Sequence, residues 1–93
     1  MTKAELVQKI SEETGIEKQE ILAIVENFMV VVKDCLQHGE EVTLRSFGGF
    51  FLKHRAEKTA RNITKNTTII VPEHDIPAFK PAKEFIESLK KLN

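Results

Sequence analysis

Several residue types are scarce or absent in this chain of 93 residues, and each absence excludes a class of protein. The single cysteine, Cys35, rules out a disulfide framework within the chain and is typical of a reducing compartment. No apolar run approaches the roughly 20 residues that cross a bilayer, and the first residues lack the apolar segment of a signal peptide. We therefore expect a cytoplasmic protein with no membrane partner.

The chain also lacks the residue clusters of a catalytic or metal site. Its histidines, His38, His54 and His74, are widely separated, and Cys35 lies in an apolar helical pattern that is typical of a buried thiol. The pair Gly48-Gly49 is not followed by the lysine and hydroxyl residue of a phosphate-binding loop. We expect no metal ion, no cofactor and no enzymatic activity.

A net charge is absent as well, because 14 Lys and Arg residues balance 14 Asp and Glu residues, but the charges are segregated. Residues 1–41 hold four cations and nine acids, whereas residues 42–93 hold ten cations and five acids. Residues 45–65 alone carry six cations against one acid, Glu57. Such a segment is typical of an arm that grips a polyanion. The alternative is that the two halves neutralise each other across the fold.

Helical periodicity dominates the first half of the chain. Thr2 and Glu5 form a capping-box pattern that begins a helix, and Thr14-Gly15 is a plausible end. Apolar residues at helical spacing predict a second helix from about residue 17 to 38. The run Phe28–Val32 covers nearly the whole circumference of that helix, and a 93-residue monomer can hardly surround it. We therefore expect a dimer with the second helix in its interface.

After Gly39 the apolar period changes to that of strands. Residues 41–45 alternate as a half-buried strand, and Gly48-Gly49 indicates a turn or bulge where chains approach closely. A hairpin arm is expected over residues 52–71, with Ile69–Val71 re-entering the core and Pro72 closing the strand. Ten residues per leg give the arm a reach of about 30 Å. A final helix follows, with a packing face formed by Phe85, Ile86, Leu89 and Leu92.

This order of elements resembles the bacterial HU and integration host factor family of DNA-bending proteins, over essentially the whole chain. Three segments carry the resemblance: Phe47–Phe50 is similar to the family's GFGxF, Arg61-Asn62 to its RNP, and Ile76–Pro81 with Lys83 to its PxFKxGK. The chain also departs from the family pattern. Ser46, Ala60 and Ala82 stand where glycine is common, and Phe51 stands where a polar residue is common. At the arm tip, Ile63 replaces the family's proline and Asn66 replaces its turn glycine. Asparagine is the non-glycine residue best suited to a positive φ.

The resemblance implies an α+β fold: two N-terminal helices, a three-stranded antiparallel sheet with an extended β-hairpin arm, and a C-terminal helix, in an intertwined dimer. We expect one HU-like DNA-binding domain over residues 1–93, with a helical dimerisation part (1–40), a sheet (41–81) carrying the arm (52–71), and a C-terminal helix (82–93). The apolar residues expected in the dimer interface are Val25, Phe28, Met29, Val32, Leu36, Leu44, Phe47, Phe50 and Phe79.

The resemblance further implies a histone-like, nucleoid-associated protein that wraps and bends double-stranded DNA through minor-groove arms, largely without sequence specificity. Ile63 would enter a base step as a wedge, the alternative being a contact with a neighbouring arm residue. The residues implied to bind DNA are Lys3, Arg45, Ser46, Lys53, Arg55, Lys58, Arg61, Asn62, Ile63, Thr64, Lys65, Asn66, Lys80 and Lys83.

Two other functions stay open from the sequence. The neutral net charge and the exposed position expected for Phe51 suit a dimeric protein-interaction scaffold with weakened DNA binding. A sequence-specific subunit like those of integration host factor is the second alternative, and pairing with a related subunit is open beside a homodimer.

Overall fold

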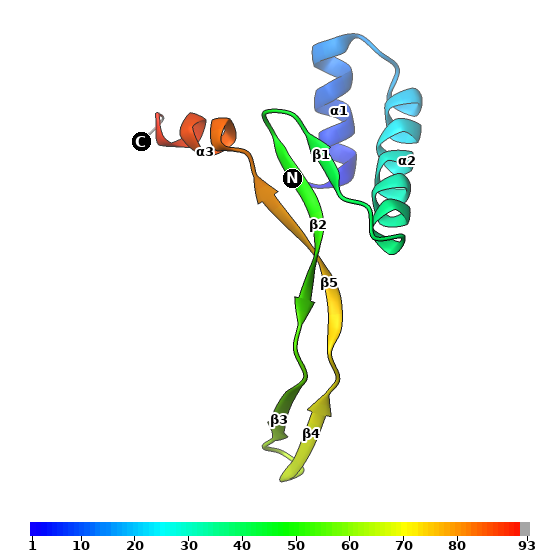
Figure 1. Cartoon of the computed structure of the whole chain (residues 1–93). Helices are drawn as coiled ribbons and strands as arrows, with labels where there is room; N and C mark the ends of the chain where they lie inside the picture. The colour runs from blue at the N-terminus through cyan, green and yellow to red at the C-terminus, as the bar shows by residue number, and fades with distance from the viewer. Residues whose placement is uncertain (92–93) are drawn as a thin grey trace. The chain divides into compact units, whose positions relative to one another are not determined.

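The computed structural model describes residues 1–91 and divides into two compact units, Met1–Cys35 and the remainder from Leu36 onward. The first unit holds helix α1 (Lys3–Thr14) and most of helix α2 (Lys18–Gln37). The second unit holds five strands and helix α3 (Lys83–Lys90), as Figure 1 shows by residue colour. Three helices with antiparallel sheets confirm the predicted α+β class.

Local sequence signals determine where α1 begins and ends. The Thr2 hydroxyl oxygen accepts a hydrogen bond from the Glu5 backbone N–H at 3.3 Å, so the predicted N-terminal cap is formed. Gly15 adopts the left-handed conformation, with φ of 77°, and its N–H donates to the Ser11 carbonyl oxygen at 2.8 Å. An ion pair between Lys3 and Glu26 joins α1 to α2.

The apolar run in α2 is helical, as predicted, but the single chain does not enclose it. Phe28 is 43% exposed and Val30 is 59% exposed. Among the hydrophobic residues that the structure describes, only Val7, Ile21 and Leu36 are buried. One copy of the chain therefore leaves most of its large apolar side chains in contact with solvent.

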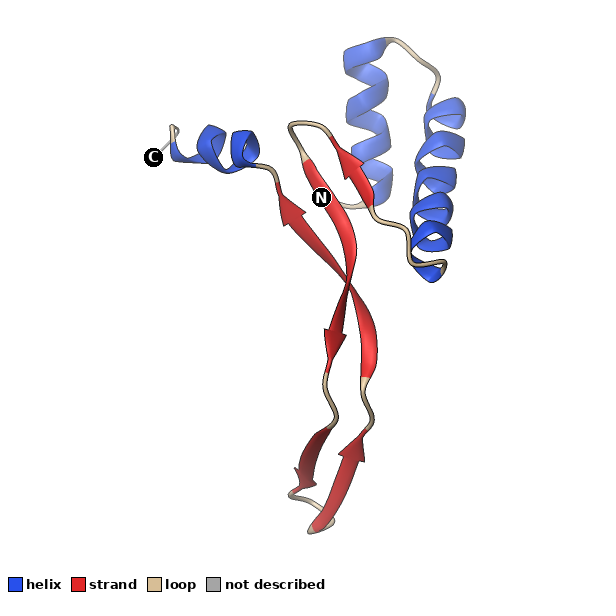
Figure 2. Ribbon diagram, viewed as in Figure 1, coloured by secondary structure: helices blue, strands red, loops and turns tan. Residues whose placement is uncertain are grey.

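Three antiparallel strands form the main sheet in the order β1 (Val42–Leu44), β2 (Gly48–Arg55) and β5 (His74–Pro81). Phe50 lies at its centre, opposite Val42 on one side and Phe79 on the other. The turn between β1 and β2 is closed by a hydrogen bond from the Phe47 N–H to the Leu44 carbonyl oxygen at 3.0 Å. Figure 2 shows β2 and β5 running past the short β1 into the arm.

The arm is longer than the predicted range 52–71. In the inner half of the arm, β2 stays paired with β5 from the pair of Leu52 with Pro77 to the pair of Arg55 with His74. The outer half is a separate two-stranded ribbon of β3 (Lys58–Asn62) and β4 (Thr67–Val71). The two halves keep the same register, with two unpaired positions on each leg between them. Pro72 lies in this interruption, where its missing N–H cannot supply a ladder hydrogen bond.

The prediction that Ile69–Val71 re-enters the core is wrong. These residues form β4 in the outer ribbon, where Ile70 is 64% exposed, and the strand that returns to the sheet is β5. Their β-branched side chains favour an extended backbone whether or not they are buried, and the sequence pattern does not distinguish the two causes.

Helix α3 is shorter than the predicted range 82–93. It begins at Lys83, with Ala82 as its N-cap, and the helical residues end at Lys90. Phe85 is half-buried, while Ile86 and Leu89 are exposed in the single chain. Leu92, predicted on the same face, lies outside the described residues. Within the described part of the chain, no helix is long and apolar enough to cross a membrane.

Candidate nucleic-acid interface

The main sheet has two chemically different faces, because the register of β1, β2 and β5 is unbroken and successive side chains alternate. One face carries the apolar residues Val42, Leu44, Phe50, Leu52 and Phe79. The other carries Thr43, Gly49, Phe51, Lys53, Arg55 and Lys80. We call the second the basic face, and it carries three of the cations implied to bind DNA.

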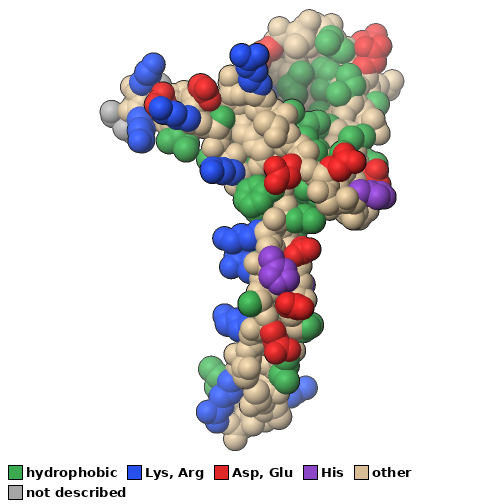
Figure 3. Space-filling model, in the orientation of Figure 1, with side chains coloured by type: hydrophobic (Ala, Val, Ile, Leu, Met, Phe, Trp, Pro, Cys, Tyr) green, Lys and Arg blue, Asp and Glu red, His purple; other side chains and the backbone are tan. Residues whose placement is uncertain are grey.

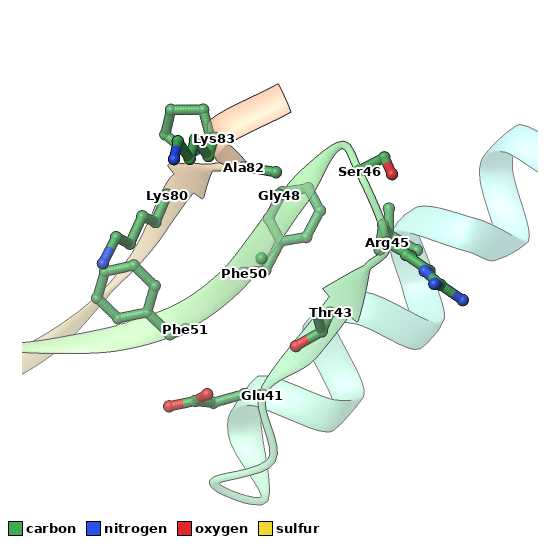
Figure 4. Close-up of a pocket in the computed structure, with 13 residues that line it drawn as sticks. Glu41, Thr43, Arg45, Ser46, Gly48, Phe50, Phe51, Lys80, Ala82 and Lys83 are labelled. Carbon is green, nitrogen blue, oxygen red and sulfur yellow. The ribbon is translucent and has the colours of Figure 1, made fainter. Parts of the chain in front are cut away.

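A hollow of about 380 Å³ lies on the basic face. Gly49 leaves it open, because Thr43 and Lys80 flank this glycine on the neighbouring strands and no side chain stands between them. In Figure 4, Lys80 and Phe51 lie on one side of the hollow, and Arg45 and Ser46 lie at the opposite rim. The hollow therefore brings together cations from β5 and from the β1–β2 turn.

Helix α3 adds its first residue, Lys83, to the rim of this hollow. Ala82 provides no side-chain cap, so the first backbone N–H groups of α3 lack the partner that a serine or aspartate would supply. Lys83 and these groups favour an anion at the same place. Glu41 is the one carboxylate among the lining residues, at the outer edge near Phe51.

The apolar face is held by an aromatic cluster. Ring centroids lie 5.0 Å apart for Phe50–Phe79, and 5.3 Å apart for both Phe47–Phe79 and Phe47–Phe85. A Cβ atom at Gly48 would come within 2.5 Å of the Phe79 ring and 2.6 Å of the Lys80 carbonyl oxygen. The predicted close approach is therefore at Gly48, which lets β2 and β5 pack tightly behind the basic face.

Ser46 has a left-handed backbone, with φ of 66°, which the sequence reasoning did not predict. The signal was present, because this serine stands where the resembling family has a glycine. A non-glycine residue in this region costs roughly 1–2 kcal/mol. The turn that positions Arg45 and Ser46 is thus strained.

The arm continues the basic face with Lys53 and Arg55 from β2. Beyond the interruption, Lys58 and Arg61 of β3 alternate onto opposite faces of the outer ribbon. Figure 3 shows Lys and Arg side chains on one side of the upper part of the arm, with Asp, Glu and His side chains on the other, whereas Lys and Arg side chains appear on both sides near the tip. Lys65 lies in the turn at the tip. The cations predicted in the arm are all solvent-exposed.

The arm carries more acids than the count over residues 45–65 includes. The return leg brings Asp75 opposite His54, where an Asp75 carboxylate oxygen lies 2.9 Å from His54 Nδ1, and Glu73 lies 3.3 Å from Nε2. The hydrogen bond to Asp75 and then that to Glu73 raise the pKa of His54 above its usual 6.5. His54 lies on the sheet face opposite Lys53 and Arg55, so these carboxylates are held away from the basic face.

Side-chain hydrogen bonds shape the arm tip. The Asn62 side-chain oxygen accepts from the backbone N–H groups of Thr64, at 3.1 Å, and Lys65, at 3.3 Å. Asn66 takes the positive φ, 53°, that its place in the turn predicts, and its side-chain oxygen accepts a hydrogen bond from Arg61. Asn62, Asn66 and Arg61 are therefore engaged in building the turn as well as lying at the predicted site.

Ile63 is 89% exposed at this tip. The alternative role weighed for it, a packing contact with a neighbouring arm residue, is not seen in the single chain. The turn presents an isolated apolar side chain between basic flanks.

The other predicted residues are distributed between the two units. Lys3 belongs to the helical unit, where its ammonium group pairs with Glu26, and this exposed ion pair is of the weak kind that a phosphate can displace. Of the residues predicted in a dimer interface, Phe28, Met29, Phe47 and Phe79 are exposed, Val25, Val32, Leu44 and Phe50 are half-buried, and Leu36 is buried within its own chain.

Phe51 and His54 are the residues near the site that the sequence reasoning did not assign. Phe51 was expected to be exposed and was taken to suit a scaffold, but it is half-buried in the structure. His54 was read as an isolated histidine. The signal for His54 was the register: centring the hairpin on residues 64 and 65 places His54 opposite Asp75. In residues 1–91, no group of three or more His, Cys, Asp or Glu side chains is arranged to hold a metal ion.

Comparison with known proteins gives concordant results. The family model described as "Bacterial DNA-binding protein" matches residues 1–90. The SPbeta prophage-derived DNA-binding protein HU 2 of Bacillus subtilis is 36% identical over 90 residues, covering 97% of this chain and 98% of that protein. The integration host factor subunit beta of Shewanella pealeana is 32% identical over 94 residues, covering 100% and 99%.

Solved structures agree with these sequence relatives. An HU–DNA cocrystal structure from Anabaena superposes with a TM-score of 0.90 at 29% identity, covering 96% of this chain and 97% of that one. HU from Thermotoga maritima superposes with a TM-score of 0.68 at 22% identity, which supports the fold alone.

Proposed function

This chain belongs to the bacterial DNA-binding protein family of HU and integration host factor, and we propose that two copies together wrap and bend duplex DNA. The family is one of structural DNA-binding proteins rather than enzymes, in agreement with the sequence prediction. The role is histone-like: largely sequence-independent packaging of DNA in the nucleoid.

The observation that carries this proposal is the continuity of the basic face with the arm. Lys80 and Lys83 at the hollow are followed outward by Lys53 and Arg55 and then by the tip, so phosphates can be neutralised along one path. The exposed Ile63 ends this path and supplies the compact apolar shape that unstacking a base step requires. The family resemblance seen in the sequence implied DNA contacts for each of these residues.

A dimer is supported by the apolar surface that one copy leaves uncovered. Phe28 and Val30 in α2 are exposed, and a second hollow of about 390 Å³ is lined by Phe79, Pro81, Phe85, Ile86, Leu89 and Lys90. Monomeric proteins rarely leave so many large apolar side chains in water. We propose an intertwined homodimer that buries both surfaces. Sedimentation of the purified chain tests it: a folded monomer at micromolar concentration would instead favour pairing with a related subunit.

The wedge role of Ile63 is tested by the DNA bend angle at saturating protein. We expect Ile63→Ala to reduce the bend measured by energy transfer between dyes at the ends of a duplex, because alanine cannot fill an opened base step. Ile70→Ala is the matched control, since it removes the same side chain from an exposed position in the arm away from the tip. An unchanged bend in Ile63→Ala refutes the wedge.

The proposed neutralisation of DNA phosphates by the basic face and the arm is tested by measuring DNA affinity at several salt concentrations. The logarithm of the binding constant should fall against the logarithm of salt concentration with a slope of roughly −0.9 for each phosphate neutralised. Arg55→Gln should make the slope shallower by about one such contact per arm. Lys91→Gln, at the exposed residue that follows α3, should leave it unchanged. A flat salt dependence for the unaltered protein would contradict DNA binding by this surface.

Binding to unrelated duplexes separates the remaining alternatives. Equal affinity for a random duplex and for sequences selected from a pool supports HU-like packaging. A strong preference for selected sequences supports a role like that of integration host factor, and no binding even at low salt supports the scaffold.

A further inference from the structure

The cluster of His54, Asp75 and Glu73 lies near the base of the arm, on the face opposite to that of Lys53 and Arg55. His54 and Asp75 are directly opposite on β2 and β5, and Glu73 precedes β5 in the interruption beside Pro72. The contacts described for the His54 ring are those with Asp75 and Glu73, one at each nitrogen. Its neighbours along β2, Lys53 and Arg55, alternate onto the basic face.

This geometry fits the charged form of histidine better than the neutral one. A neutral imidazole has one N–H donor, so one of the two carboxylates would face a lone pair. The imidazolium has two N–H donors and satisfies both carboxylates at once. All three side chains are more than half exposed, so water screens the cluster and the charge on His54 remains adjustable.

The net charge of the arm is small, so the charge on His54 changes it by a large fraction. Residues 52–77 hold five Lys and Arg residues and three Asp and Glu residues, a net charge of +2 with neutral histidines. Protonation of His54 makes it +3, so two arms change from +4 to +6. The electric field of the arm acts on a bound polyanion even where His54 does not contact the polyanion.

We propose that His54 is a positioning residue for DNA binding, whose positive charge neutralises Asp75 and Glu73 and holds them on the arm face turned away from the DNA. When His54 is neutral, the two carboxylates are uncompensated, repel each other and weaken the field of the basic face. DNA affinity is therefore highest at low pH and falls as pH rises through the titration of His54, whose pKa lies above 6.5. The inference rests on the proposed DNA-binding function.

The test is DNA affinity by fluorescence anisotropy at fixed salt, from about pH 6 to about pH 9, below the titration of lysine. We expect the dissociation constant of the unaltered protein to rise about two- to fivefold over this range, because exposed charges near screened phosphates interact weakly. His54→Gln should bind DNA at every pH with the weaker affinity that the unaltered protein has at high pH. His54→Lys should bind at every pH with the stronger affinity that the unaltered protein has at low pH. Asp75→Asn combined with Glu73→Gln should bind more strongly at every pH, because two negative charges are removed, and its pH dependence should move to lower pH, because the carboxylates that raise the pKa of His54 are gone.

His74→Gln is the matched control. His74 lies on the basic face, opposite Arg55, with its Nδ1 2.9 Å from the Pro72 carbonyl oxygen. His74→Gln therefore removes the other histidine of the arm, and the pH dependence that His54 causes should persist in this variant. If the pH dependence is lost in His74→Gln, or if His54→Gln combined with His74→Gln keeps the same pH dependence as His74→Gln alone, the proposal is overturned while DNA binding stands. Absence of binding at every pH overturns the proposed function as well. NMR titration of His54 without DNA tests the cluster separately: its pKa should fall in the Asp75→Asn, Glu73→Gln protein, and an unchanged value refutes the contacts.

Discussion

Gly48 and Gly49 are adjacent in the sequence, yet alanine should have very different effects at the two positions. A Cβ atom at Gly48 would lie 2.5 Å from the Phe79 ring and 2.6 Å from the Lys80 carbonyl oxygen. At Gly49 the nearest atom is the Val42 carbonyl oxygen, at 3.5 Å, which is an ordinary contact. The Phe79 ring could rotate, but the Lys80 backbone moves only if β5 shifts.

The free energy of unfolding should reflect this difference. Overpacking of a tight site costs about 1–3 kcal/mol, and the positive φ of Gly48, 158°, adds about 1 kcal/mol or more for a residue with a side chain. We expect Gly48→Ala to lower the free energy of unfolding by about 3 kcal/mol. Gly49→Ala should change it by less than about 1 kcal/mol, because its added methyl group enters the hollow on the basic face.

Urea denaturation followed by circular dichroism measures both variants, at one protein concentration because a dimer's stability depends on it. With a slope of about 2 kcal/mol per molar urea, Gly48→Ala should shift the midpoint down by about 1.5 M. Equal midpoints for the two alanine variants would refute the argument. DNA affinity provides a second contrast, since Gly49→Ala partly fills the hollow between Thr43 and Lys80 while leaving the fold intact.

Two other substitutions test local features of the backbone. Ser46→Gly should raise the free energy of unfolding by about 1 kcal/mol, because glycine relieves the positive φ at Ser46; a midpoint that falls would show that the serine side chain has a stabilising partner. Thr2→Ala removes the cap that the Glu5 N–H uses and should cost about 1 kcal/mol, whereas Thr2→Ser should cost little; equal losses in thermal denaturation would contradict the capping role.

Much of this architecture follows from local sequence signals. The ends of α1 at Thr2 and Gly15, the positive φ at Asn66 and the close approach near Gly48 each depend on residues within a few positions of one another. A residue such as Asn66 is chosen by the turn it must make, so its identity indicates its conformation.

The errors concern features set by pairing between distant residues. Ile69 and Ile70 look like core residues because β-branched side chains suit both buried strands and exposed ribbons. The carboxylates of Glu73 and Asp75 seemed to lie outside the arm, since a hairpin closed at Val71 would exclude them. Only the register, which continues past Pro72, shows that they face His54.

The unchanged register across the interruption at Pro72 makes the length of the arm adjustable in units of two. Adding two residues to each leg would lengthen the hairpin by about 6.6 Å and return every outer side chain to its present face. Adding one to each leg would lengthen it by about 3.3 Å and turn the outer cations over to the opposite face. An arm can therefore be lengthened without turning its outer half over only if an even number of residues is added to each leg. Such insertions would cost least at the interruption, because no ladder hydrogen bonds are lost there.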